Sequence, residues 1–185
     1  MTGRAEILSA RLILRPLRAQ DEAPACAALG QPEVAQWLGS LPHPHSPQDF
    51  RDFRARAKRG RVWAMELARS AEETRICPLP AGSFLGVIAL DPDLGYWLTP
   101  QAQGYGFAGE AAREVIAAHF ANPAAPDLES GYFLGNARSC QVLTALGFTQ
   151  SGPVREMFCR PRGMILPHVD MVLTRAGFAA AHPAG

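Results

Sequence analysis

A glycine-rich turn in the middle of the chain most constrains what this sequence can fold into. The turn at 103–109 (QGYGFAG) follows an apolar segment at 94–99 that predicts a strand, and it overlaps the start of a helix expected at about 105–121. Glycines let successive backbone N–H groups approach an anion without a Cβ in the way, and the positive end of a helix dipole attracts the same anion. The segment is therefore typical of a diphosphate-binding turn.

Three interpretations of Gly104-x-Gly106-x-x-Gly109 compete. A glycine-rich connection without a ligand is the better expectation for such a match standing alone. The spacing also fits a dinucleotide-binding fold, but that fold places the turn after its first strand and an acidic residue at the end of the next one. Asp127 and Glu129 precede the next predicted strand instead, and fewer than half of the residues follow the turn. The third interpretation is a turn for the pyrophosphate of coenzyme A, which depends on the surrounding chain.

Periodicity and turn residues predict the other elements. Strands are expected at 11–17, 62–67, 84–90, 94–99, 129–134, from 148 onward and at 168–174. Helices are expected at 21–29, about 46–58, about 105–121 and 137–146, and a long hairpin connection at 70–82. This order predicts an α/β (α+β) fold with one mixed, mostly antiparallel sheet of about seven strands and helices on both faces. One domain, with its core at about 11–175, accounts for all 185 residues.

Composition excludes several classes of function. The net charge of +1 gives no general attraction to nucleic acid or to an anionic membrane, and the basic run at 51–61 has the spacing of a solvated helix face. The N-terminus lacks the pattern of a signal peptide, and no apolar stretch approaches membrane-spanning length. We therefore expect a cytoplasmic protein. The cysteines form no CxxC pair, so neither a metal site nor a disulfide framework is predicted; they are Cys26, Cys77, Cys140 and Cys159.

The turn and its surroundings resemble a known superfamily. Gln103-x-x-Gly106-x-Ala108 matches the Q/R-x-x-G-x-G/A signature of the GCN5-related N-acetyltransferase (GNAT) superfamily. Further segments resemble its RimJ/RimL-like branch and follow in the family's order: RLILRPL at 11–17, GYWLTP at 95–100, EAA at 110–112, NARS at 136–139 and LGF at 146–148. The branch usually carries a tryptophan, a Gln/Arg and a Thr/Ser where this chain has Gln103, Tyr105 and Gly109. Two possible phosphate donors are thereby lost.

The resemblance implies a GNAT-like fold and an enzyme that transfers an acetyl group from acetyl-CoA to a primary amine, by direct attack in a ternary complex. The amine would belong to a protein N-terminus or to a small molecule. The resemblance places the coenzyme on the turn, on the strand before it and on the later NARS segment. The implied cofactor-binding residues are Trp97, Leu98, Thr99, Gln103, Gly104, Tyr105, Gly106, Phe107, Ala108, Gly109, Asn136 and Ser139.

Specific chemical roles follow from the same resemblance. The Leu98 N–H would face the thioester oxygen, and Ser139 would relay a proton to the leaving thiolate. Ser139 and Asn136 are equally credible as residues that stabilise the start of their helix. Asp93 and Glu156 are candidates for the general base, with His168 a third. Asp93 fits better as a turn residue.

The sequence leaves two further questions open. A non-catalytic acyl-CoA-binding or regulatory module on the same fold is the alternative function, because of the departures at Tyr105 and Gly109. The acceptor is not specified, although the loop at 41–45 (LPHPH) is short of the acidic residues that a polyamine requires. A homodimer is possible in this family.

Overall fold

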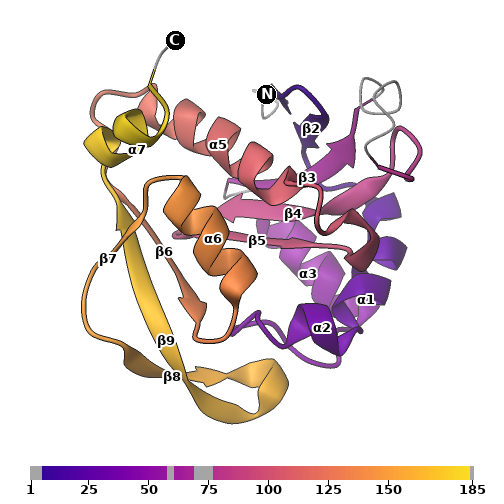
Figure 1. Cartoon of the computed structure of the whole chain (residues 1–185). Coiled ribbons are helices and arrows are strands. Elements are labelled where there is room, and N and C mark those ends of the chain that lie inside the picture. The colour runs from indigo at the N-terminus through magenta and orange to yellow at the C-terminus, as the bar shows by residue number, and fades with distance from the viewer. Residues whose placement is uncertain (1–5, 58–60, 69–76, 184–185) are drawn as a thin grey trace.

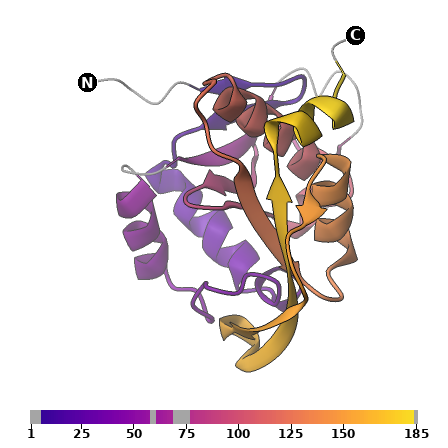
Figure 2. The same cartoon turned by 90° about the vertical axis from the view of Figure 1, so that its left-hand side faces the viewer.

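The chain folds into two antiparallel sheets, and the computed structural model describes residues 6–57, 61–68 and 77–183 (Figures 1 and 2). The first sheet has the order β1 (Ile7–Leu8), β2 (Leu12–Arg15), β3 (Val62–Leu67), β4 (Phe84–Leu90) and β5 (Leu94–Leu98). In the second, the long β9 (Met164–Leu173) pairs with β6 (Leu128–Phe133), β7 (Thr149–Gln150) and β8 (Arg155–Cys159).

Helices cover both faces of the first sheet (Figure 2). One face carries α1 (Glu22–Leu29), the short α2 (Pro32–Ala35) and α3 (Pro47–Ala57). The other carries α5 (Phe107–Phe120), beside which α6 (Ala137–Ala145) lies along the second sheet; α7 (Arg175–Ala181) follows β9. Short 3₁₀ helices occur at Ala19–Asp21, Pro100–Ala102 and Arg160–Arg162.

Separate apolar clusters hold the two helical layers to the sheet. Leu14 of β2 and Met65 of β3 belong to one buried cluster with Ala111 and Val115 of α5. A smaller cluster on the opposite face joins Val87 of β4 to α3 through Ala57, Val62 and the partly buried Phe53. Because the central strands β3 and β4 are buried on both faces, the sheet is a rigid support for the edge strand β5.

The two sheets touch near the start of β5 and diverge from there. Ser130 of β6 donates a hydrogen bond from Oγ to the carbonyl oxygen of Leu94 (2.8 Å), and no described residue pairs β5 with β6 in a ladder. Figure 1 shows the two strands running in different directions beyond this contact. β5 is therefore an edge strand whose outer backbone groups face the gap.

The predicted α/β fold with helices on both faces is confirmed, and β3 and β4 have the predicted boundaries. The predicted single sheet is instead divided in two, because side-chain contact replaces a backbone ladder between β5 and β6. The strand expected from 148 onward is divided into β7 and β8. The sequence gave no indication of β1, α2 or α7; the two-residue β1 and the four-residue α2 are too short to show a period. Most of the expected hairpin connection, 70–76, lies outside the described residues.

A bulge in β4 sets the position of β5. The register between β3 and β4 shifts at Met65 and Glu66, opposite Gly86, which has a φ of +148°. A Cβ at Gly86 would lie 2.1 Å from the carbonyl oxygen of Trp97, so only glycine permits this approach.

Candidate active site

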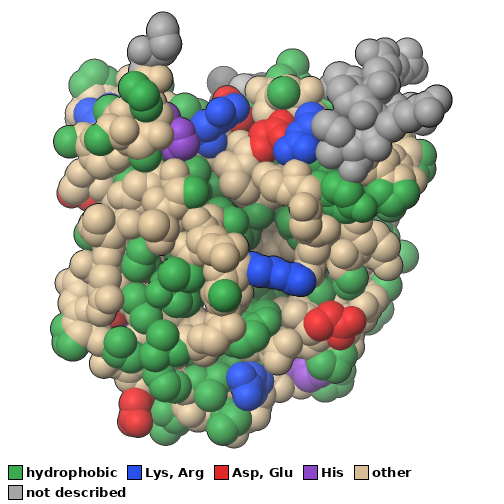
Figure 3. All heavy atoms as spheres, in the orientation of Figure 1, with side chains coloured by type: hydrophobic (Ala, Val, Ile, Leu, Met, Phe, Trp, Pro, Cys, Tyr) green, Lys and Arg blue, Asp and Glu red, His purple; other side chains and the backbone are tan. Residues whose placement is uncertain are grey.

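A cavity of about 710 Å³ opens where the two sheets diverge. Its walls come from β5, the glycine turn, the start of α5, β6, the start of α6 and the segment that links α1 to α3. In the space-filling view it is a hollow in the molecular face, with a basic side chain across it (Figure 3). Concave sites of this size, made from several elements, are typical of ligand binding.

The glycine turn forms one end of this cavity. Gly104 and Gly106 have φ values of +88° and +79°, in the left-handed region that favours glycine. Gly106 is followed directly by α5, whose first helical hydrogen bond runs from the Glu110 N–H to the Gly106 carbonyl (3.1 Å). The N–H groups of 107–109 precede that bond and have no helical acceptor. Three free donors at the positive end of a 14-residue helix fit the pyrophosphate of coenzyme A.

An ion pair behind the turn fixes the start of α5 to β2. Arg11 donates from Nε to Glu110 (2.6 Å), and its guanidinium lies over the Phe107 ring, 4.7 Å from the centroid. Glu110 also accepts from Ser9 Oγ (2.6 Å) and from the Arg11 N–H (2.8 Å). Burial acts to raise the pKa of Glu110, but these hydrogen bonds outweigh it and hold the pKa below its ordinary value. The carboxylate is thus fully engaged inside the protein.

A second polar chain links the turn to β5 and α6. Arg138 donates from Nη1 to the side-chain oxygen of Gln103, and Gln103 Nε2 donates to the Leu98 carbonyl (3.4 Å). Sequence reasoning singled out Gln103 and Leu98 but missed Arg138. Its position in the first turn of α6 gives no signal until the fold brings that turn opposite the glycine turn.

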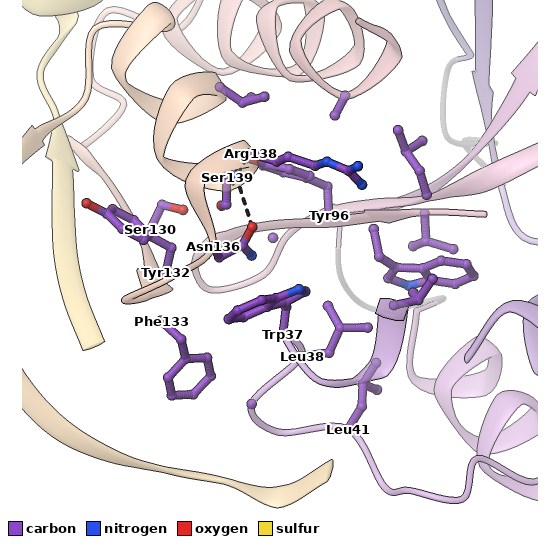
Figure 4. Close-up of a pocket in the computed structure, with 18 of the residues that line it drawn as sticks. Trp37, Leu38, Leu41, Tyr96, Ser130, Tyr132, Phe133, Asn136, Arg138 and Ser139 are labelled. Carbon is purple, nitrogen blue, oxygen red and sulfur yellow. Dashed lines mark hydrogen bonds between the residues drawn. The ribbon is translucent and has the colours of Figure 1, made fainter. Parts of the chain in front are cut away.

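Tyr96, Asn136 and Ser139 meet at the centre of the cavity (Figure 4). The Tyr96 hydroxyl lies 3.3 Å from Ser139 Oγ, and the Ser139 N–H donates to Asn136 Oδ1 (3.2 Å). Asn136 is therefore the N-cap of α6. The Ser139 hydroxyl does not cap the helix and lies beside Tyr96 at the cavity. Burial raises the pKa of Tyr96 to about 12, although the hydrogen bond with Ser139 acts in the opposite direction. Tyr96 is thus a proton donor throughout the neutral range.

The structure brings together most, but not all, of the predicted site residues. Thr99 does not line the cavity and is buried, with its N–H donating to the Leu85 carbonyl (2.8 Å). Tyr105 is also absent from the lining, and its ring lies 5.8 Å from that of Phe107. The predicted residues that line the cavity are Trp97, Leu98, Gln103, Gly104, Gly106, Phe107, Ala108, Gly109, Asn136 and Ser139.

The three candidate bases have different surroundings. Asp93 is exposed in the turn before β5, and Glu156 is exposed on β8; neither lines the cavity. His168, on β9, is buried and does line it. Its ring lies against Gly131, where a Cβ would be 2.3 Å from Cε1.

A carboxylate lies beside His168. Its Nδ1 lies 3.0 Å from Asp170 Oδ1, although the angle falls short of a hydrogen bond in this arrangement. Arg155 holds Asp170 through two hydrogen bonds, one from Nη2 of 2.9 Å, and these lower the pKa of Asp170. Burial lowers the pKa of His168 below its ordinary value, against the opposing effect of Asp170. The imidazole is therefore neutral at neutral pH.

The resemblance implies that residues 21–59 and the last hairpin select the acceptor, and both regions contribute to the far end of the cavity, although no single side chain there was named from the sequence. The walls of this end include apolar side chains from a segment without helical or strand period, together with residues of β6 and β8. A tryptophan and leucines in such a segment are the one signal that the sequence offered. The residues concerned are Trp37, Leu38, Leu41, Tyr132, Phe133 and Met157.

Within the described part of the chain, no group of three or more His, Cys, Asp or Glu side chains is placed to hold a metal ion. No described helix has the length and apolar character needed to cross a bilayer.

The comparisons with known proteins agree with this geometry. No curated protein matches the sequence. The structure is similar to an acetyltransferase of the GNAT family from Bacillus anthracis (TM-score 0.74, 14% identity, 91% of this chain and 98% of that one). It is also similar to the Vibrio cholerae spermidine N-acetyltransferase in complex with CoA and spermine (TM-score 0.71, 15% identity, 92% of this chain and 99% of that one). A third similar structure is Mycobacterium smegmatis RimJ in complex with CoA-disulfide (TM-score 0.68, 21% identity, 92% of this chain and 86% of that one). Residues 11–149 match the family model described as Acetyltransferase (GNAT) domain, and the chain therefore belongs to the GNAT acetyltransferase family.

Proposed function

We propose that this protein transfers an acetyl group from acetyl-CoA to a primary amine and belongs to the RimJ/RimL-like branch of its family. The observation that carries the proposal is the continuity of one cavity. It joins a diphosphate-sized cradle at Gly104–Gly109 to the free edge of β5 and to the Tyr96–Ser139 pair. The binding of CoA by two structurally similar proteins supports it.

The glycine turn would hold the pyrophosphate with its backbone. Gly109 stands where the branch has a hydroxyl residue, yet a Cβ there would meet nothing within 4 Å. A hydroxyl residue would therefore fit at this position, and without one the backbone N–H groups would make the contacts with the phosphates. Arg138 lies beside Gln103 and supplies a cation that the turn itself lacks.

The transfer forms an N–C bond and breaks the C–S bond of the thioester. The chain must stabilise negative charge on the carbonyl oxygen, donate a proton to the departing sulfur and accept one from the amine. A backbone N–H on the outer edge of β5, such as that of Leu98, would supply the first. Ser139 would donate the proton to the sulfur, and the Tyr96 hydroxyl, 3.3 Å from Ser139 Oγ and protonated in the neutral range, would replace it.

The amine itself decides how much help a base must give. A free α-amino group has a pKa of about 7.7–8.0 and a lysine one of about 10.4, so an α-amine needs little assistance. We favour His168 as the group that accepts the proton, because it lines the cavity and burial keeps it neutral. Asp93 and Glu156 are exposed and outside the lining, so they would need to act from a distance.

Two measurements on the purified protein test this function. Calorimetric titration with acetyl-CoA should give a Kd near the micromolar range. Release of free thiol should then depend on an added amine drawn from a panel of amino-acid amides, peptides and small amines. Failure to bind any CoA species would refute the proposal.

The departures at Tyr105 and Gly109 favour one other function, a regulatory module that binds acyl-CoA without catalysis. That function predicts acetyl-CoA binding but no thiol release with any amine of the panel. A single acceptor that is turned over would exclude it.

A further inference from the structure

The far end of the cavity forms an apolar lobe, defined here by Trp37, Leu38, Leu41, Phe133 and Met157. Figure 4 shows Trp37, Leu38, Leu41 and Phe133 together on one side of Tyr96, with Arg138 and Ser139 on the other. The Tyr96–Ser139 pair therefore lies between the glycine turn and the lobe. A ligand that fills the lobe would reach the centre of the cavity from the side opposite the diphosphate cradle.

The walls of the lobe are fixed by contacts between segments that are distant in the sequence. The Arg160 N–H donates to the Gly39 carbonyl (2.9 Å), and Cys159 Sγ donates to the Gln36 carbonyl (3.4 Å). A Cβ at Gly39 would lie 3.0 Å from the Phe133 ring and 3.1 Å from the end of Met157. The loop after α2 is thus held closely against β6 and β8, so the lobe is formed before a ligand arrives.

The lobe offers almost no charge to a ligand. Among the described residues that line the cavity, Glu33 is the one carboxylate, and it is exposed on α2. The one guanidinium in the lining, that of Arg138, is hydrogen-bonded to Gln103 at the opposite end. Burial lowers the pKa of both lining histidines, His45 and His168, although Asp49 and Asp170 act against it. A second positive charge on the acceptor would lose its water inside the lobe, and the exposed Glu33 is the one carboxylate of the described lining that could balance it.

We infer that the acceptor is a primary amine attached directly to an apolar or aromatic group without further charge, and that this group occupies the apolar lobe. The inference rests on the proposed acetyl transfer and names its acceptor class. An N-terminal residue with a large apolar side chain has this chemistry. A polyamine does not, because its remaining ammonium groups would enter a lobe whose defining residues include no carboxylate.

The apolar area of the lobe sets the size of the preference. Full burial of a leucine or phenylalanine side chain corresponds to about a ten- to hundredfold gain in binding. Amino-acid amides test it cleanly, because their α-amines share one chemical environment. We expect phenylalaninamide and leucinamide to exceed asparaginamide and lysinamide by about tenfold or more in kcat/KM, and spermine to be the poorest acceptor.

Variants separate the lobe from the rest of the cavity. Trp37→Ala should lower kcat/KM for phenylalaninamide by about tenfold and leave the Kd of acetyl-CoA unchanged. Leu41→Asp should reduce the preference for phenylalaninamide and raise lysinamide relative to asparaginamide. Phe158→Ala removes an aromatic ring that is 56% exposed and outside the cavity, and it should change neither quantity.

The possible outcomes distinguish the inferred acceptor class from the proposed acetyl transfer. Acetylation of asparaginamide, lysinamide or spermine at least as fast as phenylalaninamide by the unaltered protein would overturn the acceptor class and leave acetyl transfer intact. The same holds if Trp37→Ala, still folded and binding acetyl-CoA, keeps the full preference. Absence of transfer to every amine, despite acetyl-CoA binding, would refute the proposed function and the inference with it.

Discussion

Replacing Gly106 tests whether the turn is a diphosphate cradle, because Gly82 provides a matched control. Both glycines have nearly the same left-handed φ, +79° and +81°. A Cβ at Gly106 would meet only Arg11 Nη2, at an ordinary 3.6 Å, and one at Gly82 would meet nothing within 4 Å. Gly106→Ala and Gly82→Ala should therefore lose the same free energy of unfolding, about 1–2 kcal/mol. In a chain of this length each kcal/mol lowers Tm by about 2–4 °C.

The two positions should differ sharply in coenzyme binding. Gly106→Glu places a carboxylate beside the proposed pyrophosphate, where each pair of charges at about 4 Å repels by roughly 1 kcal/mol in water and 4 kcal/mol near a protein surface. We expect the Kd of acetyl-CoA to rise at least about a hundredfold, which corresponds to about 2.8 kcal/mol. Gly82 lies outside the cavity lining, so Gly82→Glu should leave the Kd unchanged.

The assay combines calorimetric titration with thermal melting of all four variants. Melting shows whether substitutions at Gly106 and Gly82 lower Tm by the same amount. Titration shows whether only the substitutions at Gly106 weaken the binding of acetyl-CoA. Our account of the cradle is wrong if Gly106→Glu, still folded, binds acetyl-CoA as tightly as the unaltered protein. It is equally wrong if Gly82→Glu weakens binding to the same degree.

Three further predictions concern the centre and support of the site. Ser139→Ala should lower kcat by at least about tenfold without changing the Kd of acetyl-CoA in titrations, whereas Cys140→Ala on the same helix should change neither. The pKa of Glu110 is lowered on folding, so its contribution to stability is present above its unfolded pKa and is lost as the pH falls through the folded value. In urea unfolding, Glu110→Gln should therefore cost roughly 1–2 kcal/mol at pH 7 and much less once the pH has fallen below the folded pKa of Glu110. If His168 is the base, its lowered pKa means that kcat/KM should fall with the protonation of one group below about pH 6.5. His168→Asn should remove this ionisation from the measured pH profile. An unchanged fall of kcat/KM at acid pH would exclude His168 as the base.

The strands and helices that pack on the first sheet could be predicted from the sequence because they have a period. β3 and β4 are buried runs between turn residues, and α5 repeats its apolar residues at three- and four-residue steps. The turn at Gly104–Gly109 could also be found, since glycine is the residue that left-handed backbone selects. These signals are local, and they located the end of the cavity where we propose that the cofactor binds.

The remaining parts of the site depend on contacts that no local pattern encodes. Tyr96 and Ser139 are 43 positions apart and meet because α6 follows β6 past the edge of β5. β5 and β6 belong to different sheets and meet through the Ser130–Leu94 hydrogen bond, a contact between positions 36 residues apart. The apolar lobe depends on Trp37 in a segment without a period and on Met157, which the pairing of β8 with β9 positions.

The most direct test of the central claim is a single coupled assay on the unaltered protein with acetyl-CoA and phenylalaninamide. Free thiol and N-acetylphenylalaninamide are measured together over time. We predict that the two appear in equal amounts, that both saturate with the amine, and that omission of either substrate abolishes them. Thiol release without the acetylated amide, or no release while acetyl-CoA is bound, would contradict the account.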